Sequence, residues 1–129
     1  PLKGVKRLLE LTKFTKDNLD KTIVIGTGFS WLRQYGANAA AGMVKEDWTD
    51  MAGFGRQAFA YPNFANDILE KGKMDKTKVC ISCSKCAELK GAKLKAGCVI
   101  RDQEIYLPIY RELQKEKELK KKGITAISN

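Results

Sequence analysis

The four cysteines of this 129-residue chain are the residues whose spacing most clearly implies chemistry. Cys80, Cys83 and Cys86 follow one another at steps of three, and Cys98 comes after eleven intervening residues. Three thiolates from one short stretch and a fourth from a later segment can surround a compact metal centre. The pattern C-x2-C-x2-C-x11-C therefore predicts a four-iron, four-sulfur ([4Fe-4S]) cluster with these four cysteines as its ligands.

Other uses of four cysteines remain open at this point. Zinc also accepts four thiolates, but zinc ribbons usually pair one C-x2-C knuckle with a second, and here the lone Cys98 stands in its place. Disulfides suit cysteines so close in sequence less well than a metal does, and no secretory-signal pattern precedes them in this chain. Buried free thiols would not require such regular spacing.

Composition narrows the classes of function. The chain contains no histidine, which excludes histidine-based acid–base catalysis and histidine-ligated metals within it. It has no apolar run near the roughly 20 residues that a membrane-spanning helix requires. We therefore expect no membrane partner, and since no secretory-signal pattern is present we expect a reducing, cytoplasmic location.

The positive charge is concentrated around the cysteines. Nine basic and two acidic residues lie between Lys71 and Arg101, in a chain whose formal net charge is +9. Such cations would offset the negative charge of a thiolate-ligated centre, although a solvated, lysine-rich surface explains them equally well. Residues 65–105 contain no aromatic side chain on which a base could stack, so we expect no nucleic-acid partner.

Two short strands are expected to position this region. Thr22–Ile25 is apolar and β-branched and is followed by Gly26, Thr27 and Gly28, which predicts a parallel strand buried on both faces. Met51–Phe54 predicts a second strand that ends in Gly55 and Arg56.

Four helices are expected around the strands. The first is Leu2–Phe14, and the second runs from Trp31 to about Met43 with Ser30 as its cap and with Leu32, Tyr35, Ala39 and Met43 facing inward. The third is Asn63–Lys71, with Pro62 in its first turn, apolar contacts from Phe64, Ile68 and Leu69, and Gly72 as its stop. The last begins at Pro108 and runs from Ile109 to about Lys122.

The glycine-ended strands predict a phosphate site. Glycine lets the backbone approach an anion, and an arginine can hold phosphate in a fork. Two adjacent parallel strands place both loops on one rim, where α/β barrels frequently bind phosphate. A phosphate site close to a four-cysteine cluster suggests flavin mononucleotide (FMN), a cofactor that exchanges electrons singly or as a hydride.

Two parallel strands with open edges do not make a complete α/β domain. We expect residues 1–129 to be the C-terminal part of a larger parallel α/β protein, with residues 74–100 as its cysteine loop. The rest of that protein would lie N-terminal to this chain.

Three blocks of this sequence resemble the Old Yellow Enzyme family, in particular its iron–sulfur branch, which contains 2,4-dienoyl-CoA reductase and trimethylamine dehydrogenase. The blocks are Ile23–Gly28, Asp50–Pro62 and the cysteine set, and the similarity spans Thr22 to Tyr110. The resemblance implies a (β/α)8 (TIM) barrel of which this chain holds the last two βα units, the cysteine loop and a C-terminal helix.

The resemblance also implies an activity and its cofactors. Gly28, Gly55 and Arg56 would hold the FMN phosphate, with Gly26 and Thr27 in the same site, and the four cysteines would ligate a [4Fe-4S] cluster beside the flavin. The activity would be NAD(P)H-linked reduction of an activated C=C bond in a small molecule, or a related redox step. The catalytic acid would lie on earlier strands, outside this chain. 2,4-Dienoyl-CoA reductase and trimethylamine dehydrogenase continue into a further nucleotide-binding region, which we do not expect here, so NAD(P)H would reduce FMN directly or an electron-donor protein would do so. The alternatives are a stand-alone iron–sulfur electron carrier and a zinc-stabilised binding module.

Overall fold

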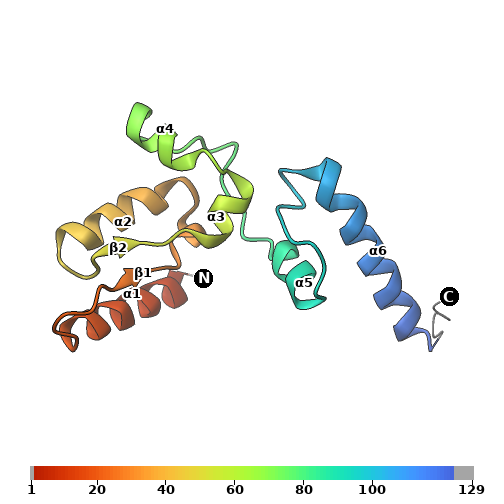
Figure 1. Ribbon diagram of the computed structural model, residues 1–129, viewed down its shortest axis with the longest axis horizontal. Helices are drawn as coiled ribbons and strands as arrows, with labels where there is room; N and C mark the ends of the chain where they lie inside the picture. Colours follow the sequence, from red (N-terminus) through yellow and green to blue (C-terminus); the bar gives the residue numbers. More distant parts are fainter. Residues whose placement is uncertain (1, 124–129) are drawn as a thin grey trace. The chain divides into compact units, whose positions relative to one another are not determined.

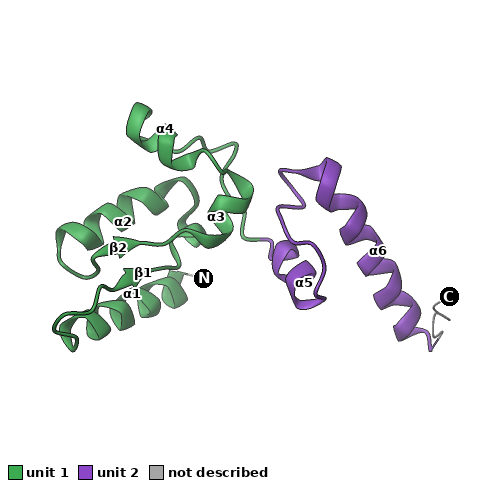
Figure 2. Ribbon diagram, in the orientation of Figure 1, with its two compact units in different colours: residues 1–82 green, residues 83–129 purple. Residues whose placement is uncertain are grey.

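A computed structural model describes residues 2–123 of the chain. These residues form two compact units, Pro1–Ser82 and Cys83–Asn129, which are coloured separately in Figure 2 and are described separately below. Residue 1 and residues 124–129, the two ends of the expected 1–129 domain, lie outside the described part. The division between the units falls inside the expected cysteine loop.

The first unit is a helix-rich βαβ arrangement (Figure 1). The two strands pair in parallel, with Ile25 opposite Met51 and Gly26 opposite Ala52, so the expected parallel pair is confirmed. Helix α2 connects the strands and contacts β2. In chain order the elements are α1 (Leu2–Asp17), β1 (Ile25–Gly26), the 3-10 helix η1 (Phe29–Tyr35), α2 (Gly36–Lys45), β2 (Met51–Ala52), α3 (Gly55–Ala60) and α4 (Phe64–Lys71).

The strand residues are not buried on both faces as expected. Val24 is 9% exposed, whereas Ile23 is 67% and Ile25 57% exposed. Side chains alternate along a strand, so Val24 lies on the covered face of this segment and Ile23 and Ile25 lie on the other. In β2 both Met51 and Ala52 are exposed. Within the described residues, nothing covers the opposite face, and the expectation of two buried faces is therefore wrong for the chain as it stands.

The α1 helix is fastened to the strands through Asp50. The Asp50 carboxylate accepts a hydrogen bond from the Val24 amide at 2.8 Å and one from Lys16 Nζ at 2.6 Å. The Lys16 ammonium, followed by the Val24 amide, lowers the pKa of Asp50 below its ordinary value. This ion pair joins the end of α1 to the β1 segment and to the residue just before β2.

The helix expected from Trp31 to Met43 is divided in two. Arg33 has φ 52° and ψ −127°, a left-handed conformation that breaks the helix into η1 and α2. The break changes the direction of the first turn, so Tyr35 is 67% exposed and its expected inward position is wrong. Met43 is buried as expected. Ser30 is not the cap, because Gly28, at φ 96°, precedes η1 instead.

The cores of the first unit lie on either side of Phe54. Phe29, Ala40 and Met43 form one buried cluster, and Tyr61, Met74 and Val79 form another. The Phe54 ring contacts the rings of Phe29 and Phe64, with centroids 5.4 and 5.2 Å apart.

Helix α4 matches its prediction in extent. It begins at Phe64 and is closed by Gly72 at φ 66°. Phe64 and Ile68 pack on the second core cluster, but Leu69 is 84% exposed, so its expected apolar contact is wrong. Leu69 directly follows Ile68, and neighbouring residues in a helix do not share a face.

The second unit is a helical pair, α5 (Lys85–Gly91) and α6 (Gln103–Lys121), closed over Leu89, Val99 and Leu113. Helix α6 begins five residues before Pro108, so the expected helix start at this proline is wrong. Pro108 has no amide hydrogen, so the helical hydrogen bond to the carbonyl of Glu104 is missing. Tyr106 and Leu107, just before this proline, pack on the core. No helix within residues 2–123 combines the length and apolar character needed to cross a bilayer.

Candidate cofactor site

The first glycine loop, Gly26, Thr27 and Gly28, lies at the end of β1 and contacts Thr49 and Leu8. The buried Thr49 hydroxyl accepts the Gly26 amide hydrogen at 2.7 Å. The Gly26 amide therefore already has an acceptor, which leaves Thr27 and Gly28 as the outer part of the loop. At Gly28 a side chain is doubly disfavoured, because φ is +96° and a Cβ atom would collide with Leu8.

The second glycine loop lies against the first. The Gly53 amide donates to the Gly26 carbonyl at 2.7 Å, at the carboxyl ends of the paired strands. Gly55 then begins α3, and a Cβ atom there would meet no atom within 4 Å. The structure thus brings together the two loops that the sequence predicted to share a rim, with open space over Gly55.

Arg56 stands beside both loops and contacts an aromatic ring. Its guanidinium lies 5.0 Å from the ring centroid of Trp31, which belongs to η1 at the end of the first loop. No carboxylate within residues 2–123 pairs with this guanidinium. A half-buried cation held by a ring, with its N–H groups free of carboxylates, is suited to binding an anion. Trp31 was not identified from the sequence as a site residue.

The start of the cysteine segment is hydrogen-bonded to the helices that follow the two glycine loops. The Cys80 amide donates to Oε1 of Gln57, the residue after Arg56, at 3.0 Å. The Ser82 hydroxyl donates to the carbonyl of Ser30, in η1, over 3.4 Å. Both contacts lie within the first unit. The start of the cysteine segment is therefore attached to the structure that follows each strand.

Gln57, which accepts the Cys80 amide hydrogen, is buried. Its side chain is fully buried, and Nε2 has no hydrogen-bond partner in the described part of the chain. An amide group buried without an acceptor costs about 1–3 kcal/mol. Sequence patterns gave no sign of Gln57 as a site residue.

The four expected cluster ligands are distributed over both units. Cys80 is buried in the first unit, whereas Cys83, Cys86 and Cys98 belong to the second. None of the four forms a disulfide within residues 2–123. Likewise, no three His, Cys, Asp or Glu side chains of these residues are gathered in a way that could hold a metal.

Backbone geometry around Cys83 favours bound sulfur or anions. Ser82 and Ser84 both have positive φ, 56° and 63°. Alternation of left-handed and right-handed residues turns successive amide hydrogens toward one point, an arrangement found at iron–sulfur sites. Here the Ser82 amide donates to Sγ of Cys80 at 3.3 Å.

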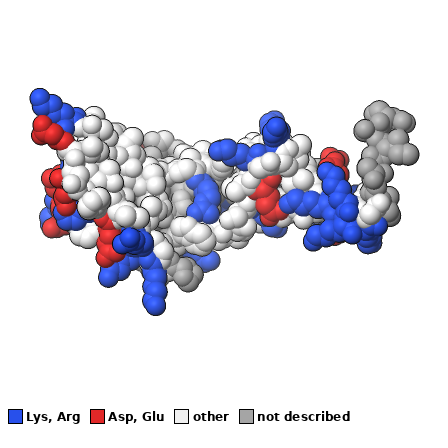
Figure 3. All heavy atoms as spheres, turned by 90° about the horizontal axis from the view of Figure 1, so that it is seen from below, with Lys and Arg blue, Asp and Glu red and all other residues white. Residues whose placement is uncertain are grey.

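Glu88, in α5, joins the two helices of the second unit through hydrogen bonds from three residues of α6. Its carboxylate accepts hydrogen bonds from Lys117 at 2.8 Å and from Gln114 and Tyr110 at 3.1 Å each. The Lys117 ammonium, more than the other donors, lowers the pKa of Glu88 below its ordinary value. Burial, followed by the nearby Glu88 carboxylate, raises the pKa of Tyr110. Figure 3 shows acidic side chains among the basic ones of the second unit, in agreement with this pairing.

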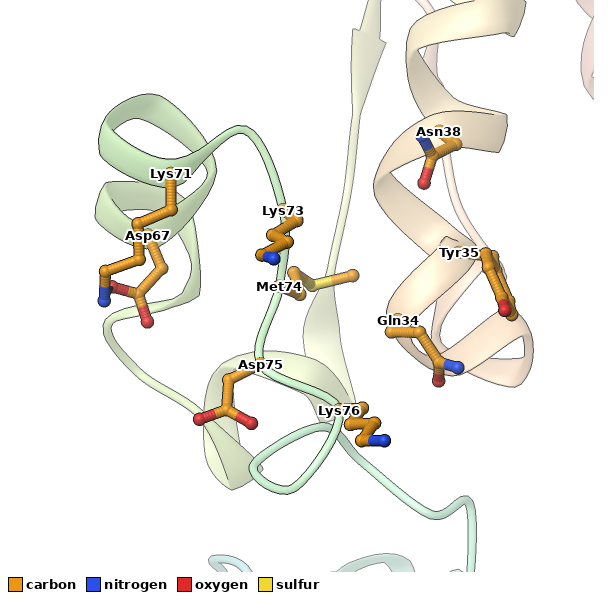
Figure 4. A pocket seen from close by; sticks show the side chains of 9 residues that line it. All are labelled: Gln34, Tyr35, Asn38, Asp67, Lys71, Lys73, Met74, Asp75 and Lys76. Atoms are coloured by element: carbon orange, nitrogen blue, oxygen red, sulfur yellow. Dashed lines mark hydrogen bonds and ion pairs between the residues drawn. The ribbon is translucent and has the colours of Figure 1, made fainter.

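A cavity of about 600 Å³ lies between η1, the start of α2 and the segment after α4 (Figure 4). Gln34 and Asn38 line one side, and Lys73 and Lys76 project from the other. Both acidic residues of the cavity are already engaged: Asp67 with Tyr61 and Lys71, and Asp75 with Thr77.

Comparisons of this chain with protein-family models, with curated proteins and with solved structures gave no match.

Proposed function

We propose that this chain is the C-terminal part of an FMN-dependent oxidoreductase barrel in which its four cysteines hold a [4Fe-4S] cluster. The whole protein would use NAD(P)H, or an electron-donor protein, to reduce an activated C=C bond in a small molecule or to perform a related redox step. The catalytic acid would come from strands outside this chain. Because thiolate ligands require a reducing compartment, we assign the protein to the cytoplasm in this proposal.

The exposed face of the strand pair supports the barrel. Ile23, Ile25 and Met51 are 67%, 57% and 54% exposed, although each is a large apolar side chain. Burying such a side chain is worth about 1.5–3 kcal/mol. In a parallel barrel this face would be directed to the packed interior, and the other strands would pair with the open edges of β1 and β2.

The rim of the strand pair supports a phosphate-bearing cofactor. Arg56 offers a guanidinium without a carboxylate partner in the described residues, and the backbone of the neighbouring Gly55 has open space over it that a ligand can enter. In this proposal Arg56 binds the FMN phosphate, Thr27, Gly28 and Gly55 contact it, and Gly26 shapes the loop. When bound, FMN exchanges a hydride with a substrate and single electrons with a cluster.

The cysteine segment supports a thiolate-ligated centre close to that rim. Cys80 Sγ already accepts the amide hydrogen of Ser82. Donors of this kind favour negatively charged sulfur. The observation that carries the proposal is that Cys80 and Ser82 are hydrogen-bonded to α3 and η1, the helices that follow the two glycine loops. One expected cluster ligand and the expected phosphate loops therefore have adjoining supports.

The proposal is tested by the contents of the full-length protein after anaerobic purification. Iron, acid-labile sulfide and FMN released on denaturation are expected together. Iron and sulfide without flavin would indicate the electron carrier, and stoichiometric zinc without sulfide would indicate the zinc module.

One cysteine variant adds a test at the level of a residue. Cys98→Ser is expected to lose much of the iron and to destabilise residues 74–100, because a serine hydroxyl is a poor ligand for a cluster iron. Full iron content in this variant would show that Cys98 is not a ligand.

A further inference from the structure

The cavity of Figure 4 is a feature of the first unit that the proposed function does not use. Its volume, about 600 Å³, is that of a small-molecule site. Two of its lining residues, Met74 and Asp67, are only 4% and 3% exposed, so part of its wall is the packed interior of this unit. Neither the glycine loops nor Arg56 line it, and it is therefore separate from the proposed FMN phosphate site.

The carboxylates of this cavity already have partners. Asp67 is paired with Lys71. Asp75 accepts hydrogen bonds from the amide and the hydroxyl of Thr77, at 2.8 and 2.7 Å, and Lys78 Nζ lies 3.8 Å from it. Each carboxylate therefore has its own cation, and neither neutralises a further lysine.

Two ammonium groups of the cavity remain without a carboxylate. Lys73 and Lys76 form no ion pair within residues 2–123. On the other side of the cavity, the side-chain amides of Gln34 and Asn38 form no hydrogen bond in the described part of the chain (Figure 4). Ammonium and amide N–H groups around one cavity suit a ligand with several anionic oxygens.

We propose that this cavity binds a diphosphate group, either free or as part of a nucleotide, between Lys73 and Lys76. Each phosphoryl group carries negative charge, so a diphosphate matches two ammonium groups, whereas a single carboxylate would leave one of them unpaired. Gln34 and Asn38 donate to the oxygens that the ammonium groups do not reach. The inference goes beyond the proposed function, in which these residues contact neither FMN nor the cluster.

Binding is measured by calorimetry on the full-length protein, with inorganic pyrophosphate and ADP as the two probes. Saturating FMN is present, so that Arg56 does not take the added phosphate. Both probes should bind, whereas adenosine, which lacks phosphate, should not. Tighter binding of ADP than of pyrophosphate would support a nucleotide as the ligand, and the reverse order would support free diphosphate. Absence of binding by both phosphates overturns the inference, as does equal binding of adenosine and ADP.

Substitutions locate the bound phosphate. Lys73→Ala and Lys76→Ala should each weaken pyrophosphate binding about tenfold, which equals about 1.4 kcal/mol and corresponds to one charge-assisted hydrogen bond. Lys45→Ala removes an exposed lysine of α2 outside the cavity and should leave the affinity unchanged. Equal affinity in all three variants overturns the inference. The proposed function is judged separately, by the flavin and iron content of the same preparation, so the two failures are distinguishable.

A second measurement uses the unmodified protein and does not depend on the stability of any variant. Brief acetylation followed by mass spectrometry gives the reaction rate of each lysine. Bound pyrophosphate should slow the acetylation of Lys73 and Lys76 but not that of Lys45. Unchanged rates at both cavity lysines would overturn the inference.

Discussion

Arg56→Ala should weaken FMN binding without loss of the fold. The guanidinium is half-buried, lies 5.0 Å from the Trp31 ring centroid and has no carboxylate partner in residues 2–123. Its removal therefore deprives a bound phosphate of a charge-assisted contact without leaving a protein anion unpaired. Such contacts are worth about 1.5–3 kcal/mol. At 1.4 kcal/mol for each factor of ten, the expected loss of affinity is about 10- to 150-fold.

Flavin fluorescence quenching measures this change in the full-length apoprotein. Riboflavin, which lacks the phosphate, is the decisive comparison, because its affinity should be the same in wild type and Arg56→Ala. Arg56→Lys keeps the charge without the fork and should be intermediate. Arg7→Ala removes an exposed arginine from α1 and serves as the control.

Two results would refute the reasoning on Arg56. One is equal loss of FMN and riboflavin binding, which would indicate damage to the loops rather than loss of a phosphate contact. The other is unchanged FMN affinity. Trp31→Leu provides an independent check, because a cation–π contact at an exposed site is worth about 0.5–1 kcal/mol. It should weaken FMN binding about two- to fivefold.

Two further predictions concern stability, measured by urea unfolding. Gly28→Ala should lower the free energy of unfolding by about 1–2 kcal/mol, because Gly28 has a φ of +96° and a Cβ atom there would meet Leu8. Gly42→Ala, within α2 and without nearby atoms, should raise it by about 0.5–1 kcal/mol. Equal effects of the two substitutions would contradict the assigned geometry. Lys117 is the main cause of the lowered pKa of Glu88. The ionised Glu88 therefore stabilises the fold at pH values above the ordinary carboxyl pKa, about 4.3. This stabilisation is lost as the pH falls through the pKa of Glu88 in the folded protein. Glu88→Gln should therefore be less stable than wild type at pH 7, and this difference should shrink at pH 3; a difference independent of pH would exclude the ion pair as its cause.

The features that the sequence predicted well are local ones. An apolar, β-branched run before Gly26 and a second run before Gly55 were sufficient for the parallel pair. Gly72 ended α4 where expected, because a glycine at φ 66° closes a helix regardless of what packs around it. Features determined by the residue and its immediate neighbours can be read from one sequence.

The features that the sequence did not predict depend on distant contacts. The left-handed conformation of Arg33 has no local signal, because arginine does not favour it. Proline is a common first residue of helices, but α6 begins at Gln103, before Pro108, because the preceding residues pack on the core. Gln57 is separated from Cys80 by 23 residues, so its role at the site appears only in three dimensions.

The hydrogen bonds that Cys80 donates to Gln57 and Ser82 donates to Ser30 have a thermodynamic consequence. They couple the conformation of the Cys80–Ser82 segment to that of η1 and α3, the helices that follow the glycine loops. A ligand that orders one of these segments reduces the conformational entropy that is lost when a second ligand orders the other. Such coupling is reciprocal. A ligand at the loops would tighten binding at the cysteines by the same factor by which a ligand at the cysteines would tighten binding at the loops. Two cofactors held on such supports would be acquired cooperatively, and loss of one would promote loss of the other.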